Sequence, residues 1–187
     1  MVNSPGKNLV STAGHCLYNK SAGGWAREVT FIPAYYNGAA PYGAWHAKRM
    51  SSFTGWTKNS NFYYDQAFFT VNGNIVNRTG GNGMGFSGQL SYPHMTVWGY
   101  PAQAPYTGQL PYYCYGKTTY ESRAGMSIVC NMTPGASGGP CFYSMSNANI
   151  GCQSANTSRW KVGGHELLTY SYRENDIWNI LNPLWHG

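Results

Sequence analysis

GASGGP, at residues 135–140, decides the interpretation of this chain. It places Ser137 among glycines, which permit a tight turn and a close approach of other backbone. In such a turn the backbone N–H groups of Gly135 and Ser137 can point at one spot and stabilise an oxyanion. Taken alone, the string fits a plain tight turn as well as it fits catalysis.

Two further motifs supply the groups that a serine nucleophile needs. TAGHC at residues 12–16 contains His15, and YYDQAFF at residues 63–69 places Asp65 ahead of an apolar strand. A serine hydroxyl is a poor nucleophile until an imidazole takes its proton and a carboxylate orients that imidazole. A histidine beside a cysteine is more often structural, but the three groups together predict a catalytic triad of His15, Asp65 and Ser137.

The chain order His, Asp, Ser resembles that of the chymotrypsin/trypsin-like serine peptidases, in particular their small secreted microbial branch. The resemblance runs from Val10 to about Leu181 and is most specific at TAGHC and GASGGP. It implies a secreted serine endopeptidase that cleaves peptide bonds through an acyl-enzyme intermediate. It also implies an all-β fold of two antiparallel β-barrels with a short C-terminal helix and the active site between the barrels.

Composition agrees with an all-β chain of one such domain over residues 1–187. Aromatic residues are 16%, glycines number 24 and charged residues are only 10%, which favours short strands joined by turns. Composition alone would predict only a sandwich or a barrel. We expect a first barrel at about residues 1–85, a second at about 90–173 and the helix at about 175–182.

The segment before His15 is short for this family. Only fourteen residues precede His15, where the family has further strands. We therefore expect an incomplete first barrel and a truncated chain, so that activity is a separate question from fold. Exposed strand edges in such a barrel favour aggregation.

Five cysteines leave one over after complete pairing. The resemblance implies a disulfide between Cys114 and Cys130. Cys141 and Cys152 flank a predicted hairpin and could be cross-linked if they lie opposite each other. In the family the partner of Cys16 lies upstream, and no upstream cysteine is present here, so Cys16 could oxidise or bridge two molecules.

The resemblance also indicates the substrate pocket. Asn131 stands six positions before Ser137, at the base of the pocket, and its neutral side chain does not favour cleavage after Arg or Lys. Ser154 stands about where the family has the serine that hydrogen-bonds the triad carboxylate, and Gln153 where glutamate-specific relatives have histidine. We expect a preference for neutral, aromatic or medium apolar residues. Asn131 could instead be a turn residue or a glycan acceptor.

Other function classes have little support. The five histidines are scattered, and neither a zinc-type cysteine spacing nor a phosphate-binding loop is present, so we expect no metal and no cofactor. The net charge of +6 is spread along the chain, and no apolar run is long enough to span a bilayer, so we expect neither nucleic acid nor membrane as a partner. No signal peptide is recognised at the start of the chain.

We expect a monomer that acts on protein or peptide substrates. The alternative is an inactive homologue that acts as a binding or interaction protein. Its 16 tyrosines and 7 tryptophans could form a sugar- or peptide-binding surface, although aromatic residues in an all-β chain more often fill the core.

Overall fold

Strands make up most of the regular structure in the computed structural model, which describes residues 1–122, 125–147, 150–161 and 165–187. The strands are β1 (Leu9–Thr12), β2 (Tyr18–Asn19), β3 (Gly24–Trp25), β4 (Thr30–Phe31), β5 (Trp45–Ser52), β6 (Ala67–Val71), β7 (Gly83–Met84), β8 (Met95–Gly99), β9 (Tyr112–Gly116), β10 (Thr118–Ser122), β11 (Gly125–Val129), β12 (Pro140–Asn147), β13 (Ile150–Trp160) and β14 (Glu166–Ser171). The α-helices are α1 (Gly14–Leu17), α2 (Thr54–Thr57), α3 (Val76–Thr79) and α4 (Glu174–Leu181), and the 3₁₀ turns are η1 (Lys20–Ala22), η2 (Phe62–Tyr64) and η3 (Asn182–Leu184).

The first half of the fold is built on the antiparallel sheet β1-β6-β5-β4. Strand β6, AFFTV, is buried along its whole length because it pairs with β1 on one side and β5 on the other. Val10 lies opposite Phe69 across β1 and β6, and both side chains are in one core cluster with Val71 and Ile75. This sheet fixes the position of the segment after β1, which carries His15, and of the segment before β6, which carries Asp65.

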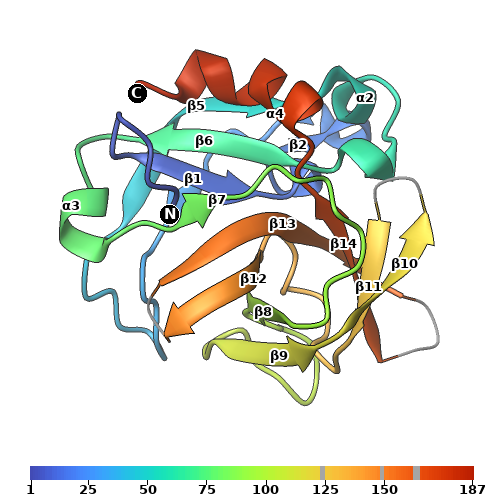
Figure 1. Cartoon of the computed structure of the whole chain (residues 1–187). Helices are drawn as coiled ribbons and strands as arrows, with labels where there is room; N and C mark the ends of the chain where they lie inside the picture. Colours follow the sequence, from blue (N-terminus) through green and yellow to red (C-terminus); the bar gives the residue numbers. More distant parts are fainter. Residues whose placement is uncertain (123–124, 148–149, 162–164) are drawn as a thin grey trace.

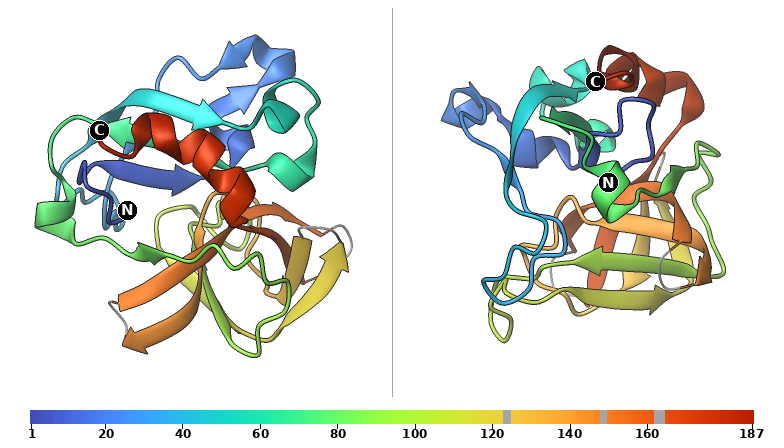
Figure 2. Two further views of the ribbon diagram at one scale, coloured as in Figure 1. Left: turned by 45° about the horizontal axis from the view of Figure 1, so that its top comes forward. Right: turned by 90° about the vertical axis from the view of Figure 1, so that its left-hand side faces the viewer.

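The second half is a larger curled sheet in the order β10-β11-β14-β13-β12-β8-β9, with β7 pairing in parallel with β13. On β8, Met95, Val97 and Gly99 all face inwards, as their alternation predicts, and Met95 and Val97 join the core cluster with Met126 and Ile128. Figures 1 and 2 show this curled sheet below the first one. The two curled half-barrels and the C-terminal helix match the trypsin-like double-barrel fold expected from the sequence.

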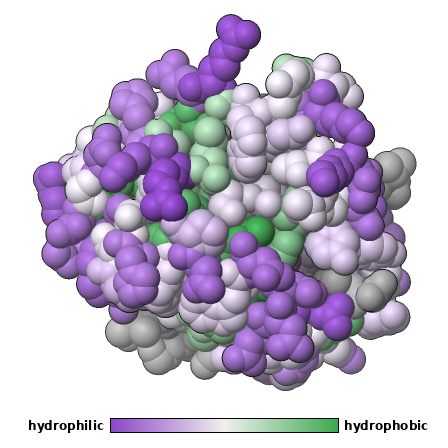
Figure 3. Space-filling view, turned by 90° about the horizontal axis from the view of Figure 1, so that it is seen from above, coloured by the Kyte–Doolittle hydropathy of each residue, from purple (hydrophilic) through white to green (hydrophobic). Residues whose placement is uncertain are grey.

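Helix α4 links the halves, because it follows β14 of the second half but packs on the first (Figures 1 and 2). Ile177 and Leu181 are fully buried in a cluster with Leu9 and Phe68. The helix begins at Glu174 after the N-cap residue Arg173, one residue before the start at about Asn175 that the sequence predicted. Seen from above in Figure 3, polar side chains cover most of this face, with apolar ones between them.

The division at about residue 85–90 stays a prediction, since no boundary is defined independently of the sheets. Among the described residues, no helix combines the length and apolar character needed to cross a bilayer.

Candidate functional site

His15 and Asp65 are in direct contact. His15 lies on the one-turn helix α1, immediately after β1, and Asp65 lies between η2 and β6. The ring nitrogen Nδ1 of His15 is 2.8 Å from Oδ2 of Asp65. The His15 side chain is 33% exposed, whereas that of Asp65 is fully buried. One ring edge is therefore held by a carboxylate while part of the ring reaches solvent.

Three donors satisfy the buried carboxylate of Asp65. The backbone N–H of His15 donates to Oδ1 at 2.7 Å, and Ser158 Oγ donates to Oδ2 at 2.5 Å. The third donor is the ring nitrogen Nδ1 of His15, which also faces Oδ2. Gly14 makes this approach possible, because a Cβ atom at that position would lie 3.0 Å from Oδ1 of Asp65 and 2.8 Å from the Trp56 ring. The carboxylate thus has fixed neighbours on both oxygens and no water-exposed surface.

The carboxylate raises the proton affinity of the imidazole. Partial burial acts to lower the His15 pKa, but the hydrogen bonds with Asp65 and Cys16 and their charges outweigh it and raise the pKa from 6.5 to about 10. The pair therefore favours a protonated imidazole, the form that a base takes after it has accepted a proton.

Ser137 lies on the loop between β11 and β12, partly exposed. Its Oγ donates to the backbone carbonyl of Ser158 at 3.2 Å. No hydrogen bond joins Ser137 to His15 within the described parts of the chain. Ser158 is thus in contact with Asp65 through its hydroxyl and with Ser137 through its carbonyl.

The Ser137 loop lies against the strand that leads to His15. Gly138, at φ +78°, is so close to Thr12 that no side chain fits, and an added Cβ would be 3.1 Å from the Ala13 nitrogen. A hollow of about 470 Å³ beside the loop is lined by Cys16 and Ser137 together with residues of both halves. The nucleophile loop and the histidine segment therefore meet at the junction of the two half-barrels.

The backbone of the Ser137 loop leaves donors available. Ala136 and Gly139 form hydrogen bonds within the loop, and the N–H of Gly138 donates to Thr157 at 2.7 Å. In the described structure, the N–H groups of Gly135 and Ser137 donate to no backbone carbonyl. Gly135 has φ +109°, a conformation that suits glycine. These two groups are free to donate to a bound oxygen.

Two residues predicted to form the substrate pocket differ in position. Asn131 is exposed on the nucleophile loop, where its pocket role stays a prediction. Ser154 is fully buried, and its Oγ has no hydrogen-bond partner, so the prediction that it lines the pocket beside the carboxylate was wrong. Ser158 contacts the carboxylate instead. The signal that was available is the polar run that extends β13 to Trp160, six residues beyond Ser154.

The cysteines follow the predictions in part. Cys114 and Cys130 form a disulfide, as the resemblance implied. The predicted Cys141–Cys152 bridge was wrong, because Cys141 lies opposite Ala155 and Cys152 opposite Ser144. An offset of three residues along a strand is about 10 Å, too far for a disulfide. Cys16 is free and exposed.

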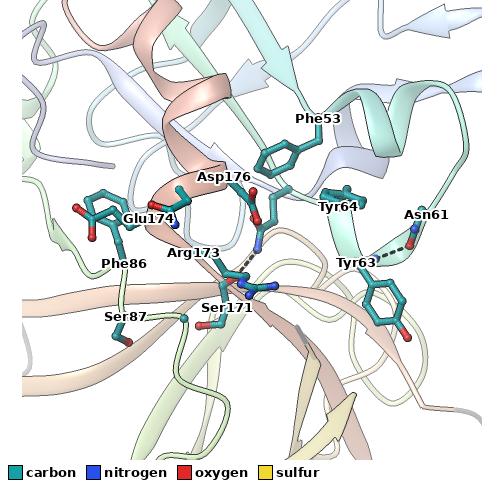
Figure 4. A pocket seen from close by; sticks show the side chains of 13 residues that line it. Phe53, Asn61, Tyr63, Tyr64, Phe86, Ser87, Ser171, Arg173, Glu174 and Asp176 are labelled. Carbon is teal, nitrogen blue, oxygen red and sulfur yellow. Dashed lines mark hydrogen bonds between the residues drawn. The ribbon is translucent and has the colours of Figure 1, made fainter. Parts of the chain in front are cut away.

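A second hollow, of about 540 Å³, lies beneath the start of α4 (Figure 4). Gln66, next to Asp65 in the chain, lines this hollow and donates from Nε2 to the carbonyls of Tyr170 and Ser171 at 2.8 and 3.1 Å. These bonds tie the start of β6 to β14. The two half-barrels are thereby held together directly behind the Asp65 carboxylate.

Potential metal ligands do not gather in the described ranges, where no three His, Cys, Asp or Glu side chains form a group able to hold an ion.

The arginine and the lysine at the end of β13 differ in their contacts. Lys161 is 2.8 Å from carboxylate oxygens of both Glu121 and Glu166. Arg159 instead places its guanidinium carbon 4.0 Å from the centre of the Phe62 ring.

Solved structures similar to this chain include proteases. The protease Anisep from Arthrobacter nicotinovorans is 33% identical, with 100% of this chain and 87% of that chain covered and a TM-score of 0.89. A thermostable serine protease, AL20, from an extremophilic microorganism is 29% identical over 98% of this chain and 87% of its own, with a TM-score of 0.88. A Glu endopeptidase in complex with MPD, 18% identical, has the same fold, with 100% and 84% covered and a TM-score of 0.84.

Two curated proteins match in sequence, and no family model matches. A glutamyl endopeptidase of Bacillus licheniformis is 27% identical over 163 residues, 85% of this chain and 51% of that protein. An extracellular metalloprotease of Bacillus subtilis is 36% identical over 73 residues, 39% of this chain and 23% of that protein. The chain thus spans about half the length of the first of these relatives and under a quarter of the second.

Proposed function

Because the chain belongs to the chymotrypsin/trypsin-like serine peptidases, we propose that it is a secreted serine endopeptidase that uses Ser137 as nucleophile, His15 as general base and Asp65 to orient His15. The observation that carries the proposal is the contact between His15 Nδ1 and the buried Asp65 carboxylate, 2.8 Å apart, at the same junction as Ser137. Protein or peptide chains are the substrate class.

The proposed reaction uses groups that are already oriented. Ser137 Oγ would exchange its bond to the Ser158 carbonyl for one to His15 and attack the peptide carbonyl as His15 takes its proton. The developing oxyanion would accept hydrogen bonds from the N–H groups of Gly135 and Ser137. His15 would return the proton to the leaving amine, and water would then hydrolyse the acyl-enzyme.

Support for an extracellular location comes from the Cys114–Cys130 disulfide, since disulfides persist mainly in oxidising compartments. One of the curated relatives is named as extracellular. For the substrate side chain, the neutral Asn131 still favours a neutral residue before the cleaved bond.

A fluorophosphonate probe tests the catalytic assignment, because it phosphonylates only an activated serine. We expect the probe to label the wild-type protein and to fail with Ser137→Ala and His15→Ala. Ser91→Ala, at an exposed serine, should keep full labelling. Folded wild-type protein that resists the probe would support the alternative, an inactive homologue that binds its partner.

A further inference from the structure

Arg159 lies beside the proposed site but has no part in the reaction described above. It follows Ser158, the residue that contacts both Asp65 and Ser137, and is the penultimate residue of strand β13. Its side chain is exposed, and so is that of the next residue, Trp160, at 41%. A substrate bound at Ser137 would therefore pass within reach of Arg159.

The edge of β13 next to Arg159 can accept an extended peptide. On one side β13 pairs with β14 as far as Trp160, opposite Leu167. On the other side its pairing with β12 ends at Asn156, opposite Pro140, where β12 gives way to the nucleophile loop. The backbone of Thr157 still exchanges hydrogen bonds with Gly138 and Gly139 of that loop. Beyond Thr157 this edge has no strand partner among the described strands, and a polypeptide can add to it by main-chain hydrogen bonds.

The guanidinium of Arg159 lies against an aromatic ring of the other half-barrel. It crosses from the second half-barrel to η2 of the first, where it lies over the Phe62 ring at 4.0 Å. Tyr170 is also close, since burial raises the pKa of Tyr170 while the Arg159 charge opposes that rise. A cation stacked in this way is oriented before any ligand arrives, which reduces the entropy cost of binding.

The charge of Arg159 is not neutralised within the protein. No carboxylate of the described residues lies within 4.0 Å of it, whereas Lys161, two residues further on, is paired with both Glu121 and Glu166. A fixed guanidinium presents a planar fork of donors that matches a carboxylate. An acidic side chain of the bound peptide is the ligand that completes this arrangement.

We propose that Arg159 is a specificity-determining residue that binds an acidic side chain of the substrate two to four residues before the cleaved bond. This inference rests on the proposed peptidase function. Under the proposed function, the residue immediately before the cleaved bond is read elsewhere, by the loop that carries Asn131.

Matched peptides test the proposal. Each carries Glu, Gln or Lys at one of the three positions, with the rest of the peptide unchanged, and kcat/KM is measured for wild type, Arg159→Gln and Arg159→Lys. At one position we expect Glu to exceed Gln by about three- to tenfold in the wild type, with Lys the poorest. Arg159→Gln should abolish the ratio, and Arg159→Lys should retain part of it.

The control variant is Arg78→Gln, at an exposed arginine on α3, which should leave the ratio unchanged. Fluorophosphonate labelling of Arg159→Gln reports whether the site is still assembled. A Glu-to-Gln ratio near one in the wild type, or a ratio that survives in Arg159→Gln, overturns the proposal. A purely structural role for Arg159 would lower kcat/KM for all peptides alike.

Binding separates this proposal from the catalytic one. Fluorescence anisotropy of the same labelled peptides with Ser137→Ala, which cannot cleave them, should show tighter binding of the Glu peptide. The double variant Ser137→Ala, Arg159→Gln should lose that difference. If the wild type cleaves nothing but this binding preference holds, the proposed activity fails and the Arg159 site stands. If cleavage is seen and the preference is absent, the reverse is true.

Discussion

Ser158 Oγ donates a 2.5 Å hydrogen bond to Oδ2 of Asp65, the oxygen that also faces the His15 ring. The donor comes from the second half-barrel and the acceptor from the first. A single hydroxyl therefore spans the junction on which the proposed triad depends.

We expect Ser158→Ala to lower both kcat and stability. The Asp65 carboxylate would lose a donor in a fully buried position, which costs about 1.5–3 kcal/mol for a bond to a charged group. The looser carboxylate would orient His15 less well, and we expect kcat to fall by about tenfold, with little change in KM. Chemical denaturation and steady-state kinetics measure the two effects.

Ser154→Ala is the matched control, because Ser154 is equally buried on β13 but its hydroxyl has no partner. That variant should be neutral or slightly stabilising. Equal losses in the two variants would mean that the Ser158 hydroxyl has no special role.

A second prediction concerns the dependence of activity on pH. Since the base must be neutral to accept the Ser137 proton, kcat/KM should rise with pH and reach half its maximum above pH 6.5, because Asp65 raises the His15 pKa. Asp65→Asn should move the midpoint towards lower pH and reduce the maximum. A wild-type midpoint at or below pH 6.5 would contradict this.

Stability should follow the opposite trend. A folded-state pKa of about 10 against 6.5 in the unfolded chain means that the folded protein holds the His15 proton more tightly. The contribution to stability is complete below pH 6.5 and is lost as pH rises towards 10. The difference in unfolding free energy between wild type and His15→Gln should therefore shrink from pH 6.5 to pH 10.

The thiols should differ in reactivity. Cys16, Cys141 and Cys152 are free, so the unfolded, non-reduced protein should react with three equivalents of a thiol reagent. In the native protein Cys16 should react first, since it is exposed. Cys141 should be protected, because burial raises its pKa to about 12. A single reactive thiol after unfolding would mean that Cys141 and Cys152 are joined by a disulfide.

Removal of the Cys114–Cys130 disulfide should destabilise the second half-barrel. The bridge closes a loop with a sequence separation of 16, for which chain entropy predicts about 3 kcal/mol. The double variant Cys114→Ser, Cys130→Ser should lose about this much in a denaturant titration. Cys16→Ser, which breaks no bridge, serves as the control.

The sequence predicted the fold class, and it indicated the groups of the proposed site, because their signals are local. GASGGP and TAGHC are short motifs with a chemical reason for each residue, and strands such as Met95–Gly99 alternate clearly. Strand β5, WHAKRMSS, was not predicted, since Lys48 and Arg49 adjoin at a bulge and interrupt the alternation.

The errors came from register, which depends on pairing between distant segments. Bulges along β12 and β13 separate Cys141 from Cys152 in the ladder. The same strand continues to Trp160, which moves the carboxylate's partner from Ser154 to Ser158. Neither the bulges nor the strand's extension can be read from hydrophobic periodicity alone.

Gly138→Ala should inactivate the protein more than it destabilises it. The position has φ +78°, which costs about 1–2 kcal/mol for a residue with a side chain, and the added methyl would collide with Thr12. The loop must then move away from the segment that carries His15, and a displacement of about 1 Å at reacting atoms can cost about 100-fold in rate. Gly116→Ala is the control, because its added Cβ meets no atom within 4 Å. We expect Gly138→Ala to lose fluorophosphonate labelling while its circular dichroism stays native, and Gly116→Ala to retain both. Normal labelling of Gly138→Ala would show that the loop can shift without separating Ser137 from His15.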